Sequence, residues 1–283
     1  MHISKGVPQG SCISPILFNI YTRLLPDKVS DPIFQFADDI TNSTSANNVE
    51  QIETNLTENF RHIKEFCQEL NLKINTEKTQ CIILKLPSKK MDKPFELQLD
   101  NVLIKSSNAV EVLGLTIDQH LSFKLHIDKK IKKCHGLMGL IQRARGTLPQ
   151  NLLKLSFTAL VRPHLEYCSL ILAGAAKTNL VKMETVQKIA SRLICGVAKD
   201  AHAEPLLQKL GLQTLQERRE RKVIKTVKDI FNENCHPMLH DMFRLGEDGL
   251  ITNEVKSRTT FDKKKFSSYA KELYNSLLKD TLD

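Results

Sequence analysis

Two adjacent aspartates, Asp38 and Asp39, stand in an apolar and β-prone stretch that reads FQFADDIT over residues 34–41. Neighbouring carboxylates repel one another, and an unpaired carboxylate is costly to remove from water. The pair is therefore expected either in a solvated turn or beside something positive. For a bare Asp-Asp pair a surface β-turn is the simpler interpretation, but the apolar residues on both sides favour a turn against a packed sheet. Carboxylates in such a place are typical ligands of Mg²⁺, which prefers oxygen.

The elements that would position this pair are a tight hairpin over residues 33–41 and the segments on either side of it. Upstream, the sequence GVPQGSCISPILFNIY (6–21) begins as a glycine-containing loop whose backbone can approach another group closely. A short helix is expected next, with Ser14 as its N-cap and Pro15 at its first position. The buried stripe of this helix is expected to contain Ile16, Leu17, Ile20 and Leu24.

Residues 47–72 have the pattern of a long amphipathic helix, with Asn47 as a possible cap and apolar residues at spacings of three and four. This helix is expected to pack on the sheet that carries the aspartate hairpin. Further strands are expected over 80–86, over 95–106 as a pair with its turn at 100–101, and over 110–123 as a short hairpin around Gly114. The first part of the chain is therefore predicted to be an α+β layer.

After about residue 120 the pattern becomes helical and basic. Helices are expected over 121–145 and near 150–173, 179–195, 205–234 and 265–280. The first of them carries Lys129, Lys130, Lys132 and Lys133, and the segment ERRERKVIKTVK (217–228) is also rich in basic residues. Charge runs on helices are usually solvated faces. Beside a candidate metal site, binding of phosphate groups is an equally good interpretation.

The bulk composition is that of a soluble globular protein, with 41% hydrophobic and 26% charged residues among 283. The net charge of +9 favours polyanionic partners, nucleic acid above all. The seven scattered cysteines form no C-x-x-C pair, which favours a reducing compartment over a disulfide framework or a zinc knuckle. The chain shows no signal peptide and no apolar stretch of membrane-spanning length. An intracellular location, cytoplasmic or nuclear, is therefore expected.

Four sequence stretches together carry a resemblance to a known family. GVPQGSCISPILFNIY, FADD, LNLKINTEKTQ and VEVLGLTID follow one another in the order and spacing seen in the reverse transcriptases of non-LTR (LINE-type) retrotransposons. The later stretches LSFKLHIDKKIKK, VRPHLEYCSLIL, METVQKIASRLI and FSSYAKELYNSLL resemble the region that follows the polymerase domain in those elements. The resemblance thus covers nearly the whole chain.

The resemblance implies a role for each matching residue. The aspartates of the ADD motif bind two catalytic Mg²⁺ ions in this family, so Asp38 and Asp39 take that role here. Lys78 resembles a lysine near the triphosphate that acts as a proton donor, although a surface turn lysine is an equally good interpretation. The loop that lies against the template and the incoming nucleotide corresponds to Gly6, Pro8, Gln9, Gly10 and Ser11.

Beyond these motifs, Leu113 and Gly114 match the hairpin that grips the primer end in the family. The helices that follow correspond to the thumb, whose basic face, including the four lysines at 129–133, would follow the backbone of the duplex. The partners implied are therefore an RNA template, a DNA primer and dNTPs, with no membrane.

The sequence also departs from the family pattern. The third catalytic aspartate of the family lies upstream of the PQG loop, as do the fingers and the endonuclease, and this chain starts after that point. The isolated chain is therefore expected to be inactive as a polymerase. It contains no tryptophan. The positions where the family usually has tryptophan are occupied by Phe66, Phe123, Leu172 and Tyr274.

The sequence therefore predicts an α+β fold with a polymerase palm remainder, an antiparallel sheet with packed helices, over residues 1–118. An all-helical thumb-like region over 119–235 and a C-terminal helical tail over 236–283 are expected to follow. The predicted function is that of a partial RNA-directed DNA polymerase of a non-LTR retrotransposon. The alternatives are a non-enzymatic nucleic-acid-binding remnant of a retroelement and a fragment without function.

Overall fold

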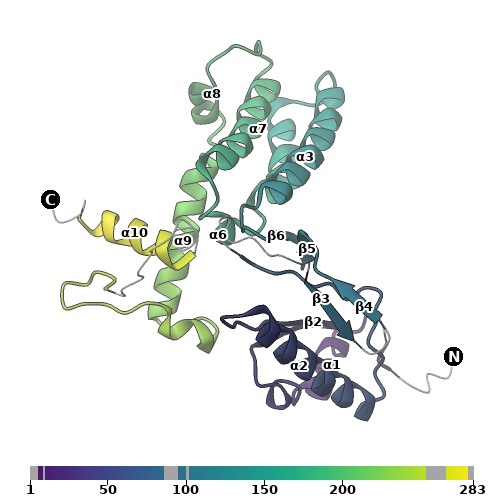
Figure 1. Ribbon diagram of the computed structural model, residues 1–283. Coiled ribbons are helices and arrows are strands. Elements are labelled where there is room, and N and C mark those ends of the chain that lie inside the picture. Colours follow the sequence, from purple (N-terminus) through teal and green to yellow (C-terminus); the bar gives the residue numbers. More distant parts are fainter. Residues whose placement is uncertain (1–5, 9, 86–94, 100–101, 253–265, 280–283) are drawn as a thin grey trace. The chain divides into compact units, whose positions relative to one another are not determined.

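The computed structural model describes residues 6–8, 10–85, 95–99, 102–252 and 266–279 (Figure 1). Over these residues the chain combines helices with small antiparallel sheets, which agrees with the α+β class. The chain divides into two compact units, and each unit has its own hydrophobic core. No helix within the described ranges combines the length and the apolar character that crossing a bilayer requires.

The first unit comprises Met1–Ile83 and Lys90–Asn108. It contains two separate antiparallel hairpins, β1 with β2 and β3 with β4, together with its helices. Its elements are α1 (Ser14–Thr22), η1 (Pro26–Lys28), β1 (Ile33–Phe36), β2 (Asp39–Asn42), α2 (Val49–Glu69), β3 (Glu96–Leu99) and β4 (Val102–Lys105).

Helix α2 organises this unit. Asn48, one residue later than expected, caps the helix by accepting a hydrogen bond from the main-chain N–H of Gln51 at 2.8 Å. The buried Asn59 donates from its side-chain amide to Asp31 at 2.8 Å and to Asn42 at 3.3 Å, which ties α2 to the base of the β1–β2 hairpin. One stripe of α2 packs with Leu25, Val29 and Ile33, and another packs against the β3–β4 hairpin through Ile52, Leu56 and Phe60. The helix was expected to pack on the sheet of the aspartate hairpin; within the described residues it contacts only the base of that hairpin, and the hairpin it packs against is β3–β4.

The expectation for α1 was wrong in its orientation. The four apolar residues assigned to its buried stripe, Ile16, Leu17, Ile20 and Leu24, are all exposed. The helix instead contacts the unit through the opposite face, where Ser14 and Thr22 are buried. Ser14 is also not the N-cap, because the helix begins at Ser14 and its hydroxyl donates to the carbonyl of Pro8. The periodicity correctly identified an apolar face on this helix. It could not show that the described residues of this unit leave this face exposed.

The strand expected over residues 80–86 was also wrong for the described part. Only Cys81 pairs, in an isolated bridge with Ser106, and residues 86–94 lie outside the described residues. The strand pair over 95–106 is confirmed, with its turn at 100–101 again outside the described residues.

The second unit comprises Leu84–Lys89 and Ala109–Asp283. It begins with the antiparallel hairpin of β5 (Ala109–Val112) and β6 (Leu115–Asp118), and the rest is helical. The helical elements are α3 (Lys124–Ala144), α4 (Gln150–Ser156), the π-helical turn η2 (Phe157–Val161), α5 (Arg162–Glu166), α6 (Ser169–Leu172), α7 (Lys177–Cys195), α8 (Ala203–Lys209), α9 (Leu215–Phe231), η3 (Pro237–Met242) and α10 (Phe266–Lys279).

Two of the long helices expected from the sequence are interrupted. The segment 150–173 breaks after α5, where Cys168 adopts a left-handed conformation with φ 53°. The segment 205–234 divides at Gly211, and α9 then starts at a capping box in which Thr214 and Glu217 exchange hydrogen bonds between side chain and main chain. Helices α3 and α7 lie side by side (Figure 1), and η2 and α5 share the same core with them.

The units divide the chain near residue 109, whereas the boundary expected from the sequence lay at residue 118. The reason is the packing of Leu115 and Ile117, which join the core of the helical unit. Where tryptophan was expected, Phe66, Phe123 and Leu172 are buried, so smaller side chains fill these positions. Tyr274 is half-buried against the edge of the Phe231 ring.

Candidate functional site

Asp38 and Asp39 lie at the turn of the β1–β2 hairpin. Phe36 pairs with Asp39, so Ala37 and Asp38 form a two-residue connection, and both aspartates are exposed. Ala37 has φ 52°, a left-handed value that is uncommon for a residue with a side chain. The tight hairpin predicted from the sequence is confirmed.

The surroundings of the pair differ from the expectation of a turn pressed against a packed sheet. Phe34 and Phe36 are 49% and 66% exposed, and Ile40 is exposed as well. Alternate residues of a strand share one face, so Phe34 and Phe36 form an uncovered apolar face of the ribbon. The aspartates are therefore solvated, and the described residues of this unit do not cover the ribbon beside them.

The donor set suits a hard cation but is incomplete. Exposed carboxylate oxygens are the ligands that Mg²⁺ prefers. Within the described ranges, no group of three or more histidine, cysteine, aspartate or glutamate side chains is placed to hold a metal ion. Asp38 and Asp39 thus supply two carboxylates, and the residues described here add no third.

The glycine-containing loop next to α1 is held by one side chain. The Ser14 hydroxyl donates to the carbonyl of Pro8 at 2.7 Å, and the main-chain N–H of Ser11 donates to the same carbonyl at 3.3 Å. Gly6 and Gly10 have φ values of 91° and 85°, which favour glycine, and the space where each Cβ would stand is open. Gln9 lies outside the described residues. The expectation that this loop lies against the template and the incoming nucleotide stays a prediction.

Lys78 lies in a turn that Asn75 organises. The main-chain N–H of Lys78 donates to the Asn75 side chain at 3.2 Å, and the Thr79 hydroxyl donates to the Asn75 carbonyl. The Lys78 side chain is exposed. This geometry suits the surface-turn interpretation and leaves the proton-donor role a prediction.

The β5–β6 turn consists of Leu113 and Gly114, as the sequence predicted. Both have positive φ, 48° and 76°, which is the signature of a type I′ hairpin turn. The hydroxyl of Tyr167 donates to the carbonyl of Leu113, and a Cβ at Gly114 would lie 3.6 Å from that hydroxyl. The Leu113 side chain is 46% exposed, so the turn presents an apolar group to solvent.

Two contacts hold this hairpin to α3. The ammonium of Lys129 lies 2.5 Å from the carboxylate of Glu111, and the main-chain N–H of Thr116 donates to Nδ1 of the buried His126 at 3.2 Å. Burial first, and then the nearby Lys130, lower the pKa of His126 to about 4. The ring is therefore neutral at physiological pH and can accept this hydrogen bond.

Asp118 connects β6 to α3. Its buried carboxylate accepts hydrogen bonds from the main-chain N–H groups of His120, Ser122 and Phe123 and from the Ser122 hydroxyl, at 2.7–3.1 Å. Burial raises the pKa of Asp118, but these hydrogen bonds outweigh burial and hold its pKa below the ordinary value. Sequence analysis missed Asp118, although an aspartate four residues before a serine at a helix start was a usable signal.

The four lysines predicted to track phosphates differ in their surroundings. Lys129 pairs with Glu111, and the ammonium of Lys130 lies 4.7 Å from the centre of the Tyr167 ring. Lys132 and Lys133 are exposed on the same helix. Lys129 therefore helps to hold the β5–β6 hairpin, and Lys130 contacts the tyrosine whose hydroxyl binds the hairpin turn.

Comparison with known proteins adds an independent line of evidence. Residues 1–117 match the family described as reverse transcriptase (RNA-dependent DNA polymerase). The chain is 28% identical over 229 residues to the probable RNA-directed DNA polymerase from transposon BS of Drosophila melanogaster, covering 76% of this chain and 25% of that protein. It is 25% identical over 234 residues to the RNA-directed DNA polymerase from mobile element jockey of the same organism, covering 74% and 24%. No solved structure matches the chain.

A third relative comes from another organism. The Retrovirus-related Pol polyprotein from type-1 retrotransposable element R1 of Nasonia vitripennis is 28% identical over 144 residues, which covers 49% of this chain and 43% of that protein. Residues 1–117 are thus similar to reverse transcriptases. The chain is related to the RNA-directed DNA polymerases of non-LTR retrotransposons, as the resemblance predicted. It spans about a quarter of the length of the two Drosophila relatives.

Proposed function

We propose that this chain is the C-terminal part of the polymerase domain of a retrotransposon reverse transcriptase, followed by its thumb. The first unit is part of the palm, and the helical unit is the thumb-like region. The observation that carries the proposal is the position of Asp38 and Asp39 at a hairpin turn, in a FADD sequence within the 1–117 match. An RNA template, a DNA primer and dNTPs are the partners, in the cytoplasm or the nucleus.

In this assignment, Asp38 and Asp39 hold Mg²⁺ through their carboxylate oxygens. Paired metal ions activate the attacking hydroxyl and stabilise the leaving group in phosphoryl transfer. The protein's part is to fix the two carboxylates on a two-residue turn and to leave them open to solvent. The complete ligand set requires a further carboxylate, for which the aspartate upstream of the PQG loop is the candidate.

The other predicted residues take supporting roles in the same assignment. The loop of residues 6–11 approaches the template and nucleotide with its main chain, and Lys78 reaches toward the triphosphate. Leu113 and Gly114 contact the primer end. Lys129, Lys130, Lys132 and Lys133 neutralise backbone phosphates of the duplex.

The exposed lysines of α3 support a second candidate function, a nucleic-acid-binding protein without polymerase activity. The two functions share the basic helical unit and differ in whether the aspartates take part in chemistry. We expect the isolated chain to bind duplexes and not to extend primers, because two carboxylates alone hold metal ions loosely.

The test combines binding and primer extension. In fluorescence anisotropy, the purified chain should bind RNA–DNA duplexes with little sequence preference and a log–log salt slope of about −0.9 per phosphate neutralised. Replacing all four lysines with alanine should flatten that slope. The double variant Lys132→Gln/Lys133→Gln should do so in part and leave the contacts of Lys129 with Glu111 and of Lys130 with Tyr167 in place. Lys209→Gln, an exposed lysine on α8, is the matched control.

Two results would contradict the proposal in different ways. If the chain fails to bind duplexes at low salt, the nucleic-acid-binding role is wrong. If the chain extends a primer on an RNA template with Mg²⁺ or Mn²⁺, and Asp38→Ala abolishes that extension, the expected inactivity is wrong and the catalytic role is established.

A further inference from the structure

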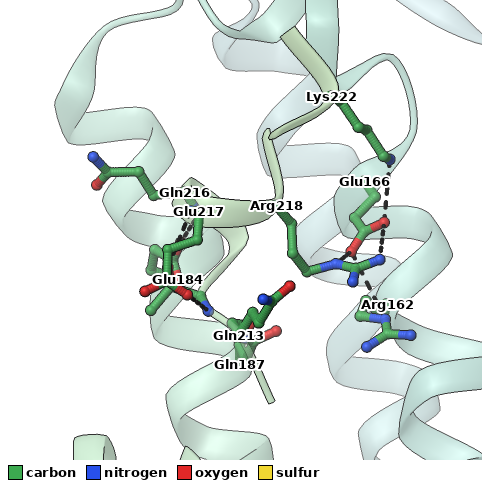
Figure 2. Close-up of polar contacts among 10 residues, drawn as sticks. Arg162, Glu166, Glu184, Gln187, Gln213, Gln216, Glu217, Arg218 and Lys222 are labelled. Atoms are coloured by element: carbon green, nitrogen blue, oxygen red, sulfur yellow. Dashed lines mark hydrogen bonds and ion pairs between the residues drawn. The ribbon is translucent and has the colours of Figure 1, made fainter. Parts of the chain in front are cut away.

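Three basic side chains converge on one carboxylate between α5 and α9 (Figure 2). Arg218 donates to both oxygens of Glu166, from Nε to one oxygen and from a terminal nitrogen to the other at 3.1 Å. Lys222 donates from Nζ to Glu166 at 3.2 Å. Nε of Arg162 lies 3.7 Å from the same carboxylate. The cluster therefore joins two helices that are far apart in the sequence.

The charges in this cluster do not balance. Burial raises the pKa of Glu166, but the hydrogen bonds from Arg218 and Lys222 outweigh burial and keep its pKa below the ordinary value. The carboxylate is thus ionised at neutral pH, and three cations around one anion leave a net charge of +2. The Glu166 and Arg162 side chains are only 15% and 24% exposed, so water screens this excess incompletely.

The guanidinium group of Arg162 has N–H donors that Glu166 does not engage. Its contact with Glu166 at 3.7 Å is longer than a hydrogen bond. Figure 2 shows its terminal nitrogens on the side away from the Glu166 carboxylate. Within the described residues, no hydrogen bond engages those nitrogens. Burial first, and then the neighbouring Arg218, lower the pKa of Arg162, while Glu166 acts in the opposite direction.

Other basic residues lie on the helices around the cluster. Helix α5 packs against both α3 and α9. His164, two residues from Arg162 and thus on the other side of α5, lies near the lysines of α3: burial first, and then Lys133 and Lys130, lower its pKa. On α9, Arg221 and Lys225 are exposed three and seven residues after Arg218, which places them on the same side of the helix. Seven residues of α-helix rise about 10 Å, comparable to the axial distance covered by about three phosphates of one strand.

We propose that Arg162, Arg218 and Lys222, held in place by Glu166, form a binding site for a phosphodiester group of a nucleic-acid backbone. The site rests on the proposed function and adds a contact point on α5 and α9 to the lysines of α3. Guanidinium groups match phosphate oxygens with two parallel donors, which a point charge does not. Glu166 holds Arg218 and Lys222 in one arrangement before the ligand arrives, which reduces the side-chain entropy lost on binding.

The experiment measures binding of an RNA–DNA hybrid duplex to the full chain over a range of salt concentrations. Arg162→Gln and Lys222→Gln should each weaken binding and reduce the magnitude of the log–log salt slope by up to about 0.9. Arg162→Lys keeps the charge and should retain the slope, while Lys209→Gln should change neither quantity. Circular dichroism and urea unfolding confirm the fold of each variant.

The outcomes separate this site from the proposed function. If the wild type binds and Lys132→Gln/Lys133→Gln weakens binding, but Arg162→Gln and Lys222→Gln in folded protein leave the slope unchanged, the cluster is only a brace between helices and the site is wrong. If the wild type binds no duplex, the proposed function itself fails. If the two variants lose binding of dATP and keep binding of the duplex, the cluster takes the phosphates of a nucleotide and the backbone assignment is overturned.

Discussion

The hydroxyl of Tyr167 donates a hydrogen bond to the main-chain carbonyl of Leu113, 54 residues earlier in the chain. This contact fastens the tip of the β5–β6 hairpin to the residue that follows α5. The neighbouring residue Glu166 points to α9 and binds Arg218 and Lys222. Two consecutive residues of the HLEYC sequence thus connect the hairpin turn with the basic side chains of α9.

Removing the Tyr167 hydroxyl should loosen the hairpin without unfolding the unit. We expect Tyr167→Phe to lower the free energy of unfolding by about 0.5–1.5 kcal/mol, the usual net value of one hydrogen bond. Hydrogen exchange of the amides in 109–118 should accelerate. Tyr21→Phe is a matched control, because the Tyr21 hydroxyl donates to the carbonyl of Leu70 in the other unit. Unchanged exchange in the Tyr167 variant, or equal acceleration in the control, would contradict this assignment.

Substitution of Gly114 should be costly for a conformational reason. Gly114 has φ 76°, and an added Cβ would meet the Tyr167 hydroxyl only at an ordinary contact distance of 3.6 Å. Gly114→Ala should therefore cost roughly 1–2 kcal/mol through the left-handed backbone, with little steric clash. Urea unfolding measures the cost. Gly136→Ala, in a helix and with open space around its Cβ, is the control and should be neutral or stabilising.

Replacing Ala37, next to the aspartate pair, with glycine is expected to maintain or raise the stability of the protein. Ala37 has φ 52°, so Ala37→Gly relieves a conformation that costs about 1–3 kcal/mol in residues with a side chain. This gain should offset the entropy that glycine loses on folding. Thermal unfolding should show an unchanged or higher midpoint for this variant, whereas Ala37→Val should lower the midpoint. A clear loss of stability in Ala37→Gly would mean that the turn is not strained.

Acid should weaken the helical unit in two stages. Burial and Lys130, with Lys129 in the same direction and Glu111 opposing, hold the pKa of His126 near 4 instead of 6.5. The unfolded state therefore binds more protons between these values, so stability is full above about pH 6.5 and falls as the pH drops toward 4. The contribution of Asp118 is present above its unfolded pKa of about 3.9 and is lost as the pH falls through its lowered folded value.

Urea unfolding at a series of pH values measures both stages. His126→Asn keeps an acceptor for the main-chain N–H of Thr116 but does not titrate, so it should remove the first stage and leave the second. The same pH dependence in His126→Asn and in the wild type between pH 6.5 and 4 would show that another group is responsible.

Metal binding should depend on the aspartate pair and should be weak. Asp38→Asn/Asp39→Asn should abolish the weak binding of Mn²⁺, used in place of Mg²⁺, that calorimetry or electron paramagnetic resonance detects in the wild type. Because both residues are exposed, stability should change by no more than about 0.5 kcal/mol. Asp200→Asn, an exposed aspartate in the helical unit, is the control. Equal Mn²⁺ affinity in all three proteins would remove the metal-site interpretation.

Sequence analysis located the elements whose signals are local. The hairpins around Asp38 and Gly114 and the helix α2 have turn residues or periodic apolar residues that act over a few positions. It failed where the answer depends on distant partners. The exposed face of α1 shows no local difference from a buried one, and the π-helical turn at Phe157–Val161 has no sequence signature of its own.

The residues of the candidate site also differ in whether local sequence signals could identify them. Motif order identified the aspartates, the loop and the β5–β6 turn, because each resides in a short contiguous stretch. Glu166 and Tyr167 could not be assigned roles, since their hydrogen-bond partners Arg218, Lys222 and Leu113 lie more than 50 residues away and only folding brings them together. The stretch VRPHLEYCSLIL did mark the place where these contacts occur.

The packing of the β5–β6 hairpin with the helical unit determines where segments of two related retrotransposon proteins can be joined. A junction at residue 118 would keep the hairpin from one parent while taking His126, Lys129 and Tyr167 from the other. A junction between Asn108 and Ala109 keeps every one of these contacts within a single parent. Chimeric proteins, and natural recombinants between element copies, should therefore tolerate crossovers at 108–109 better than crossovers inside 109–167.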